Sequence, residues 1–300
     1  MNYVKYFSLC LKNLPVRLFS LLFVLNLQNV MAQSTDRINL DYQQFGDTNG
    51  VSTNSVSGLF GHRMFLDDDG ANLLTLSLKY SQVQLTDDTL SGPDKERQLK
   101  SISTEMNLLR ILNEEYSVAI TLRPGVFGDL EGSLSDDFRL EGGFVVTRFM
   151  SDNLTLGLGL GRGTNFGRDL VVPLFQFLYF ASDKIVVRGL LPVSASLWYI
   201  PSQQWEFGFI YRLQGSLYNI DETNISGAKQ VGFAAAQTGV ASRYKVFGNN
   251  VLEAEAGVTA LRRYEWTDKR GTSFDISQKP FLDRDLGNTG YFKLSWLQKF

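Results

Sequence analysis

The stretch Gly290-Tyr-Phe-Lys-Leu-Ser-Trp-Leu-Gln-Lys-Phe300 decides the fold. Every second residue counted back from Phe300 belongs to one set, and that set is mostly large and apolar. The residues between them are mostly polar, and Gln298 is the one polar member of the apolar set. A period of two is the period of a β-strand whose faces meet different surroundings. We therefore expect a strand over residues 290–300.

This pattern resembles the closing strand of a bacterial outer-membrane β-barrel. In that class the last strand also serves as a signal for the machinery that assembles barrels. The resemblance implies that Phe292, Leu294, Trp296 and Phe300 form such an assembly signal here.

The N-terminal segment has the composition of a secretory signal peptide. Lys5, Lys12 and Arg17 precede the apolar run 18–27, and Val30-Met-Ala32 offers residues that suit a signal peptidase. The run is shorter than the ~20 residues that a membrane-spanning helix requires. We expect residues 1–32 to be a signal peptide and residues 33–300 to be the mature domain.

Composition narrows the classes of function. The single cysteine, Cys10, lies in the expected signal peptide, so the mature domain would hold no disulfide and no thiolate metal site. Three of the 29 basic residues lie there too, which leaves 26 basic against 31 acidic residues. No basic patch indicates nucleic acid. Aromatic residues make up 13% of the chain, which argues against disorder.

Alternating segments and breaks predict an all-β fold. Short breaks such as 113–115 and 151–153 take turns with longer polar ones such as 86–96 and 219–228, as in outer-membrane barrels. We expect an antiparallel transmembrane β-barrel of about 14 strands with meander topology, or of 12 if segments 184–191 and 193–200 are too short to cross. A secreted soluble β-sandwich is the alternative.

A second resemblance rests on the segment Leu170–Tyr199. Its two prolines, the Ser182-Asp-Lys turn and the Leu190-Leu-Pro tip resemble an uncharacterised family of Gram-negative outer-membrane β-barrels. The similarity extends over residues 138–218. It implies a fold and a place in the cell outer membrane, and it implies no activity.

Strand parity predicts which charged side chains face the lumen. Buried charges must be paired or hydrated, so these residues either pair across a plugged interior or line a water-filled pore. The predicted lumen-lining residues are Lys79, Glu105, Arg123, Arg139, Glu141, Glu206, Arg212, Glu253, Glu255, Arg263, Glu265 and Lys293. Their mixed signs predict no strong preference for anions or cations, and we favour a closed or narrow lumen.

Two further features are candidate sites. The only histidine, His62, shares parity with the apolar face near a short turn, so it is badly placed to act as a general base. Gly157, Gly159, Gly161 and Gly163 are expected to face the lumen, with Phe175, Phe177 and Tyr179 of the next strand beside them. Those aromatics either fill the barrel or line an apolar ligand groove.

The sequence thus favours a narrow pore, or a transporter of small solutes or apolar ligands. A structural or surface-interaction barrel without transport is the alternative, and an enzyme is not expected. We expect no cofactor and no metal. The expected partners are outer-membrane lipid, lipopolysaccharide and the barrel assembly machinery.

Overall fold

The structure is a computed structural model of the chain. It describes residues 36–67, 70–130, 134–221, 223–225, 227–267 and 282–299. The expected signal peptide and Phe300 lie outside these ranges.

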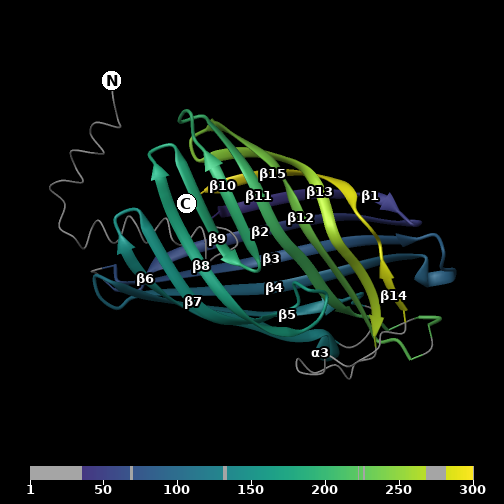
Figure 1. The fold of residues 1–300 in the computed structure, drawn as a ribbon. Coiled ribbons are helices and arrows are strands. Elements are labelled where there is room, and N and C mark those ends of the chain that lie inside the picture. Colours follow the sequence, from purple (N-terminus) through teal and green to yellow (C-terminus); the bar gives the residue numbers. More distant parts are fainter. Residues whose placement is uncertain are drawn as a thin grey trace.

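Strands make up nearly all of the described chain (Figure 1). A 3-10 turn η1 (Gly92–Asp94) and a short helix α3 (Leu134–Asp137) lie in two of the loops. Among the described residues, no helix has the length and apolar character needed to cross a membrane. The strands are β1 (Asp36–Thr48), β2 (Val51–Phe65), β3 (Asn72–Asp87), β4 (Glu96–Ile111), β5 (Tyr116–Gly128), β6 (Phe138–Ser151), β7 (Leu154–Gly163), β8 (Leu170–Ser182), β9 (Ile185–Leu191), β10 (Ser194–Tyr199), β11 (Trp205–Asn219), β12 (Gln230–Phe247), β13 (Asn250–Thr267), β14 (Leu282–Asp285) and β15 (Thr289–Lys299).

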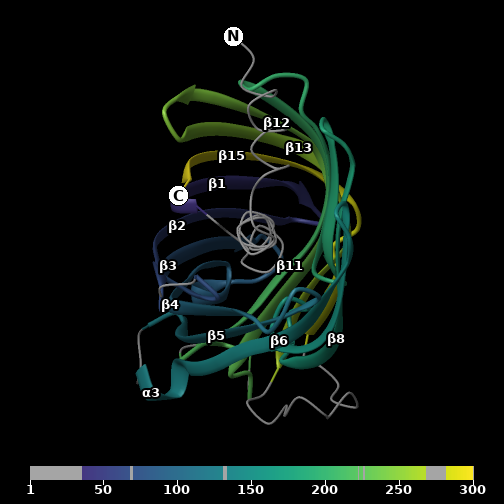
Figure 2. The ribbon, with the colours of Figure 1, turned by 90° about the vertical axis from the view of Figure 1, so that its left-hand side faces the viewer.

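The strands close into an antiparallel barrel. Each strand from β1 to β13 pairs with its neighbours in chain order, β13 pairs with β15, and β15 pairs with β1. The short β14 pairs with the far end of β13, ahead of β15 on the same side. The barrel wall therefore has 14 strands in meander order, which confirms the predicted fold class; Figure 2 shows the ring from one end.

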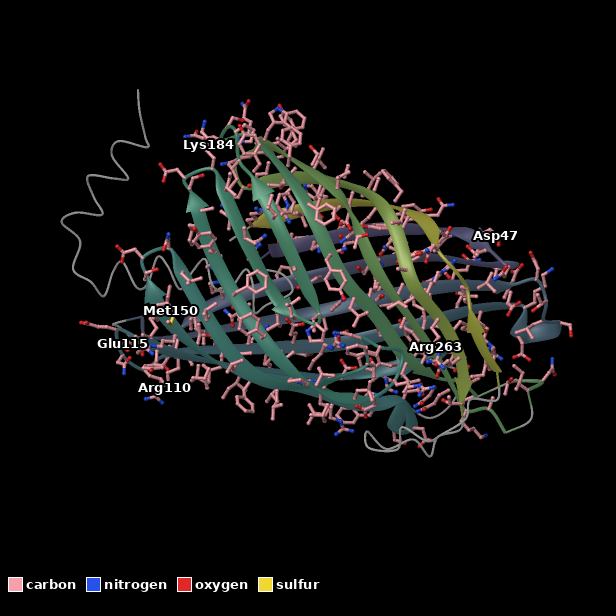
Figure 3. The ribbon with its side chains drawn as sticks, viewed as in Figure 1. Asp47, Arg110, Glu115, Met150, Lys184 and Arg263 are labelled. Atoms are coloured by element: carbon pink, nitrogen blue, oxygen red, sulfur yellow. The ribbon has the colours of Figure 1, made fainter. Side chains whose placement is uncertain are left out.

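The two ends of the barrel differ. We call the end that carries the connections 66–71, 112–115, 152–153, 183–184, 200–204 and 248–249 the short-turn end, and the other the long-loop end. In Figure 3, Glu115, Met150 and Lys184 mark the short-turn end, and Asp47 and Arg263 mark the long-loop end. Short and long connections alternate along most of the chain, as the sequence predicts, and the two-residue turns 49–50 and 192–193 are the exceptions at the long-loop end.

The outward face of the wall is apolar. Large side chains at alternate positions leave 40–68% of their surface exposed, and such a continuous apolar band is typical of a wall that meets lipid. Its members include Val56, Phe60, Leu78, Ile120, Phe144, Leu158, Phe207, Phe209, Val240, Leu252, Val258, Phe292 and Leu294.

The long-loop end of the lumen is filled by an apolar cluster, which we call the apolar plug. Inward residues of β2–β5 pack there against inward residues of β11–β13, and the barrel narrows so far that Asn219 of β11 pairs with Gly128 of β5. The plug consists of Val51, Leu85, Leu99, Phe127, Tyr218, Ile220, Ala228, Val231, Tyr264, Trp266 and Leu286.

The hairpin β9–β10 is the shortest part of the wall. The two strands have 7 and 6 residues, while their neighbours β8 and β11 have 13 and 15. Both strands nevertheless form, so the wall has the 14 strands predicted and not 12. Because the hairpin ends at the turn around Pro192, β8 and β11 continue past it toward the long-loop end (Figure 1).

Candidate functional site

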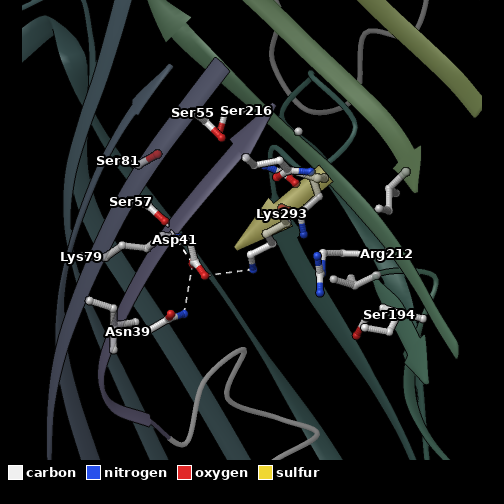
Figure 4. Close-up of a pocket in the computed structure, with 18 of the residues that line it drawn as sticks. Asn39, Asp41, Ser55, Ser57, Lys79, Ser81, Ser194, Arg212, Ser216 and Lys293 are labelled. Carbon is white, nitrogen blue, oxygen red and sulfur yellow. Dashed lines mark hydrogen bonds and ion pairs between the residues drawn. The ribbon is translucent and has the colours of Figure 1, made fainter. Parts of the chain in front are cut away.

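A polar chamber of about 310 Å³ lies inside the barrel, on the short-turn side of the apolar plug. Inward side chains of β1–β5 form one wall of the chamber, and those of β9–β12 with β15 form the other (Figure 4). The chamber exists because one wall carries short side chains where a filled barrel would carry large ones.

Serine residues create this space. Ser57 of β2 stands opposite Asp41 of β1, Ser81 of β3 stands opposite Ser57, and Ser101 of β4 stands opposite Ser81. Cross-strand partners point to the same face, so this row runs across four adjacent strands. A serine hydroxyl both donates and accepts hydrogen bonds, so the wall can bind water or a polar solute without a fixed charge.

Most charged groups at the chamber are held in ion pairs. Lys293 Nζ lies 3.1 Å from Asp41 Oδ1, and Arg212 Nη2 lies 3.2 Å from Glu255 Oε2. Arg123 pairs with Glu141. Such pairs offset part of the cost of removing charge from water, so they hold these groups in fixed positions.

Several described polar groups at the chamber lack a partner, among them Asn39 Oδ1 and Trp198 Nε1, and two further positions stand out. Among the described residues, Lys79 forms no ion pair, although its side chain lines the chamber next to Asp41 (Figure 4). Gln43 is only 3% exposed, and its Nε2 donor has no hydrogen-bond acceptor. Because a buried polar group without a partner is costly, these two positions indicate contact with water or a bound solute.

Ten of the twelve predicted lumen residues point inward. Lys79, Glu105, Arg123, Arg212 and Lys293 line the chamber. The others take part in the polar network around it: Arg139 donates to the Leu217 carbonyl at 2.6 Å, Glu141 accepts from Thr164 Oγ1 at 2.7 Å, Glu206 and Glu253 pair with Arg243, and Glu255 accepts from Tyr291 at 2.6 Å.

The prediction for Arg263 and Glu265 is wrong because β13 contains a bulge. Leu261 has a φ of 52°, and the register with β12 shifts between Ala234 and Ala236. The extra residue reverses the parity of the strand beyond it. Arg263 consequently points to the outward face, and Glu265 points to the same side, where it pairs with Arg168 of the β7–β8 loop at 2.7 Å.

Arg262 takes the inward place instead. It is fully buried, and its guanidinium donates to the carbonyls of Gly46 and Val51 at 3.1 and 3.4 Å and to Thr53 Oγ1 at 3.1 Å. It therefore links β13 to β1 and β2 across the lumen, beside the apolar plug.

The predicted inward placement of the β8 aromatics is also wrong. Phe175 and Tyr179 are 41% and 40% exposed and point outward, while Leu174, Gln176 and Leu178 point inward and are buried. Phe177 lies on the outward face over Gly189, where an added Cβ would come within 2.6 Å of its ring. The aromatic cover of a glycine does occur, but on the lipid side.

The glycine run of β7 does face inward from Gly157 onward, opposite Gln176. His62 stands opposite Leu76 on the exposed outward face of β2, and it lines neither the chamber nor the cavity beside it.

Sequence reasoning missed Asp41 and Arg243. Asp41 has the same parity as Asn39 and Gln43, so the inward face of β1 could have been found by alternation alone. Arg243 pairs with Glu253 at 2.5 Å, and the two stand opposite one another across the β12–β13 turn. Counting equal steps from the turn at Gly248 would have found this pair.

Comparison with solved structures returns other barrels at low identity. The NanC porin is 9% identical with a TM-score of 0.43, and the match covers 88% of this chain and 100% of that one. A Pseudomonas aeruginosa FadL homologue is 11% identical with a TM-score of 0.41 and 88% coverage of both chains. LpxR from Salmonella typhimurium is 7% identical with a TM-score of 0.37, covering 87% and 100%. None of these likenesses transfers an activity to this chain.

Among curated proteins, no sequence matches this chain. A family profile does match, over residues 61–294, and this range runs from β2 into β15 and includes most of the chamber wall. The chain therefore belongs to the family described as "Domain of unknown function (DUF6268)".

Proposed function

We propose that this protein is an outer-membrane β-barrel that carries small polar solutes through a narrow, normally restricted lumen. The observation that supports it best is the polar chamber, with its serine wall and its unpartnered Lys79, enclosed by a wall whose outward face is apolar. A polar interior is common to transmembrane barrels, but a barrel plugged throughout by packed side chains would leave no such space, so the chamber favours transport over a purely structural role.

The apolar plug supports restriction of the flow. It fills the long-loop end, so the chamber has no wide polar route in that direction among the described residues. Ions crossing an apolar constriction lose hydration, and such constrictions act as gates in other channels. We infer that the long-loop end faces the outside, that residues 1–32 are removed on secretion, and that Phe292, Leu294 and Trp296 of β15, with Phe300, are read by the assembly machinery.

The test is conductance and solute flux of the mature protein in lipid. In planar bilayers we expect rare openings of low conductance, and in liposomes we expect slow uptake of small sugars and amino acids. The variant Ser81→Trp, which fills the serine wall, should reduce both. Ser151→Trp, at an exposed position near a short turn, is the matched control and should change neither.

Two results would contradict this function. One is recovery of the folded protein in the soluble periplasmic fraction. The other is a heat-modifiable, lipid-inserted barrel that passes neither ions nor solutes, which would favour the structural alternative.

A further inference from the structure

The barrel wall has a gap in its strand pairing above the β9–β10 hairpin, and the β7–β8 loop covers this part of the wall: Asn165 packs against Gly215 of β11, and Gly167 packs against Gly232 of β12. Pairing of β8 with β9 ends at Phe175 and Leu191, and pairing of β10 with β11 ends at Ser194 and Arg212. Residues 170–174 of β8 and 213–219 of β11 extend beyond the hairpin with no strand between them. The end of β11 turns instead toward β5, away from β8.

A second cavity of about 120 Å³ lies at this gap. We call it the side cavity. Val172 and Leu174 of β8, Leu190 and Val193 at the hairpin tip, and Phe166 of the β7–β8 loop form an apolar lining. Gly163 of β7 leaves the space open, because a Cβ there would meet only Glu141 Oε2, at 3.8 Å, while Gly161 lies against the Leu174 side chain.

The side cavity adjoins the polar chamber. Both are lined by Glu105, Arg123, Asn165, Leu190 and Val193, so these residues surround the passage between the two spaces. The apolar lining thus gives way to charged groups at the Arg123–Glu141 pair. Beyond it Lys79, the chamber cation without an ion pair among the described residues, lies across β4 from Arg123.

We propose that the side cavity and the chamber together bind a small amphipathic anion, a carboxylate with one apolar chain, and that this ligand passes between the lumen and the membrane through the gap beside the hairpin. The apolar chain would occupy the side cavity, and the carboxylate would contact Arg123 and Lys79. The apolar plug fills the long-loop end, so a ligand moving from the chamber to the membrane would pass the β7–β8 loop at this gap. This inference rests on the proposed function insofar as it requires a membrane-inserted barrel.

The primary experiment is saturable binding of radiolabelled decanoate to the mature protein in nanodiscs, with decanol and decylamine as probes of the charge requirement. Decanoate should bind, decylamine should not, and decanol should bind at least tenfold more weakly. Gly163→Phe fills the side cavity and should reduce decanoate binding at least tenfold. Gly290→Phe, at an exposed outward glycine of β15, is the matched control and should bind normally.

A second variant guards against misfolding at Gly163. Val193→Trp narrows the same cavity from the hairpin tip and should also reduce decanoate binding, while heat-modifiable migration on gels reports that each variant is folded. The double variant Arg123→Gln/Glu141→Gln removes the ion pair without stranding a charge. It should weaken decanoate binding and leave decanol binding unchanged.

The outcomes separate this inference from the proposed function. Equal binding of decanoate to wild type, Gly163→Phe and Val193→Trp, with solute uptake retained, would overturn the side-cavity inference alone. In another outcome, wild type binds decanoate, both variants lose this binding, and the barrel shows no solute flux. That result would support the side-cavity inference and contradict the polar-solute function.

Discussion

At the scale of single residues, the two neighbouring arginines of β13 show how strongly one bulge decides side-chain roles. Arg262 is buried and bonded to β1 and β2, while the Arg263 side chain is 46% exposed. Arg262→Ala would leave the buried oxygens that it binds without a donor, which costs about 1–3 kcal/mol. Arg263→Ala removes an ion pair whose arginine is half-exposed, and the buried Glu265 keeps its pair with Arg168, so the change should cost less than about 1 kcal/mol. Urea unfolding in lipid vesicles measures the free energy of unfolding of both variants. Equal losses in the two variants would contradict the presence of the bulge.

The chamber lysines give a second test at this scale. Lys293→Gln leaves the part-buried carboxylate of Asp41 without its ion pair, so we expect a loss of about 1–3 kcal/mol in the free energy of unfolding. Lys79→Gln breaks no ion pair among the described residues, and its free energy of unfolding should stay within about 0.5 kcal/mol of wild type.

Conductance tests the same lysine in another way. Lys79→Glu should shift the reversal potential in the direction that indicates selectivity for cations. A reversal potential that stays at the wild-type value would place Lys79 away from the ion path.

At the scale of elements, each strand has one lipid face and one lumen face. Arg in place of an outward residue near the bilayer midplane costs about 2–4 kcal/mol. We expect this loss for Phe209→Arg and Val258→Arg, and also for Phe175→Arg, because β8 presents its aromatics to lipid. Ser81→Arg, directed into the chamber, is the control and should be far milder in vesicle unfolding. If Phe175→Arg lowered the free energy of unfolding only slightly, that result would indicate that Phe175 points into the lumen.

The elements also show how far sequence reasoning reaches. Alternation predicts the strands and the inward charges of β3–β6 and β11, because apolar and polar residues there occupy opposite faces. It fails in β8, where Leu174, Phe175, Phe177 and Leu178 make both faces apolar and only burial against the lumen distinguishes them. Alternation fails again in β13, because the composition of the strand does not reveal the one extra residue that forms the bulge. The plug and the two cavities depend on contacts between strands far apart in the chain, which no local pattern contains.

At the scale of the whole molecule, the apolar plug couples stability to permeability. Trp266 and Tyr264 are fully buried, and their rings meet edge to face at 6.0 Å. Trp266→Ala should lower the free energy of unfolding by about 3–5 kcal/mol and should raise single-channel conductance, because it removes volume from the constriction. Trp205→Ala, at an exposed site stacked on Phe207, is the control and should leave conductance unchanged. Destabilisation without any rise in conductance would mean that ions do not pass the plug.

The short hairpin has a further consequence for the lipid around the barrel. A wall that is lower at β9–β10 than at β12 and β13 presents an apolar band of uneven height. Lipid beside the hairpin must thin, or the barrel must tilt toward that side, and each costs a fraction of a kcal/mol per Å of mismatch. The thickness of the surrounding bilayer therefore bears on the orientation of this protein, and thin membranes should suit the hairpin side best.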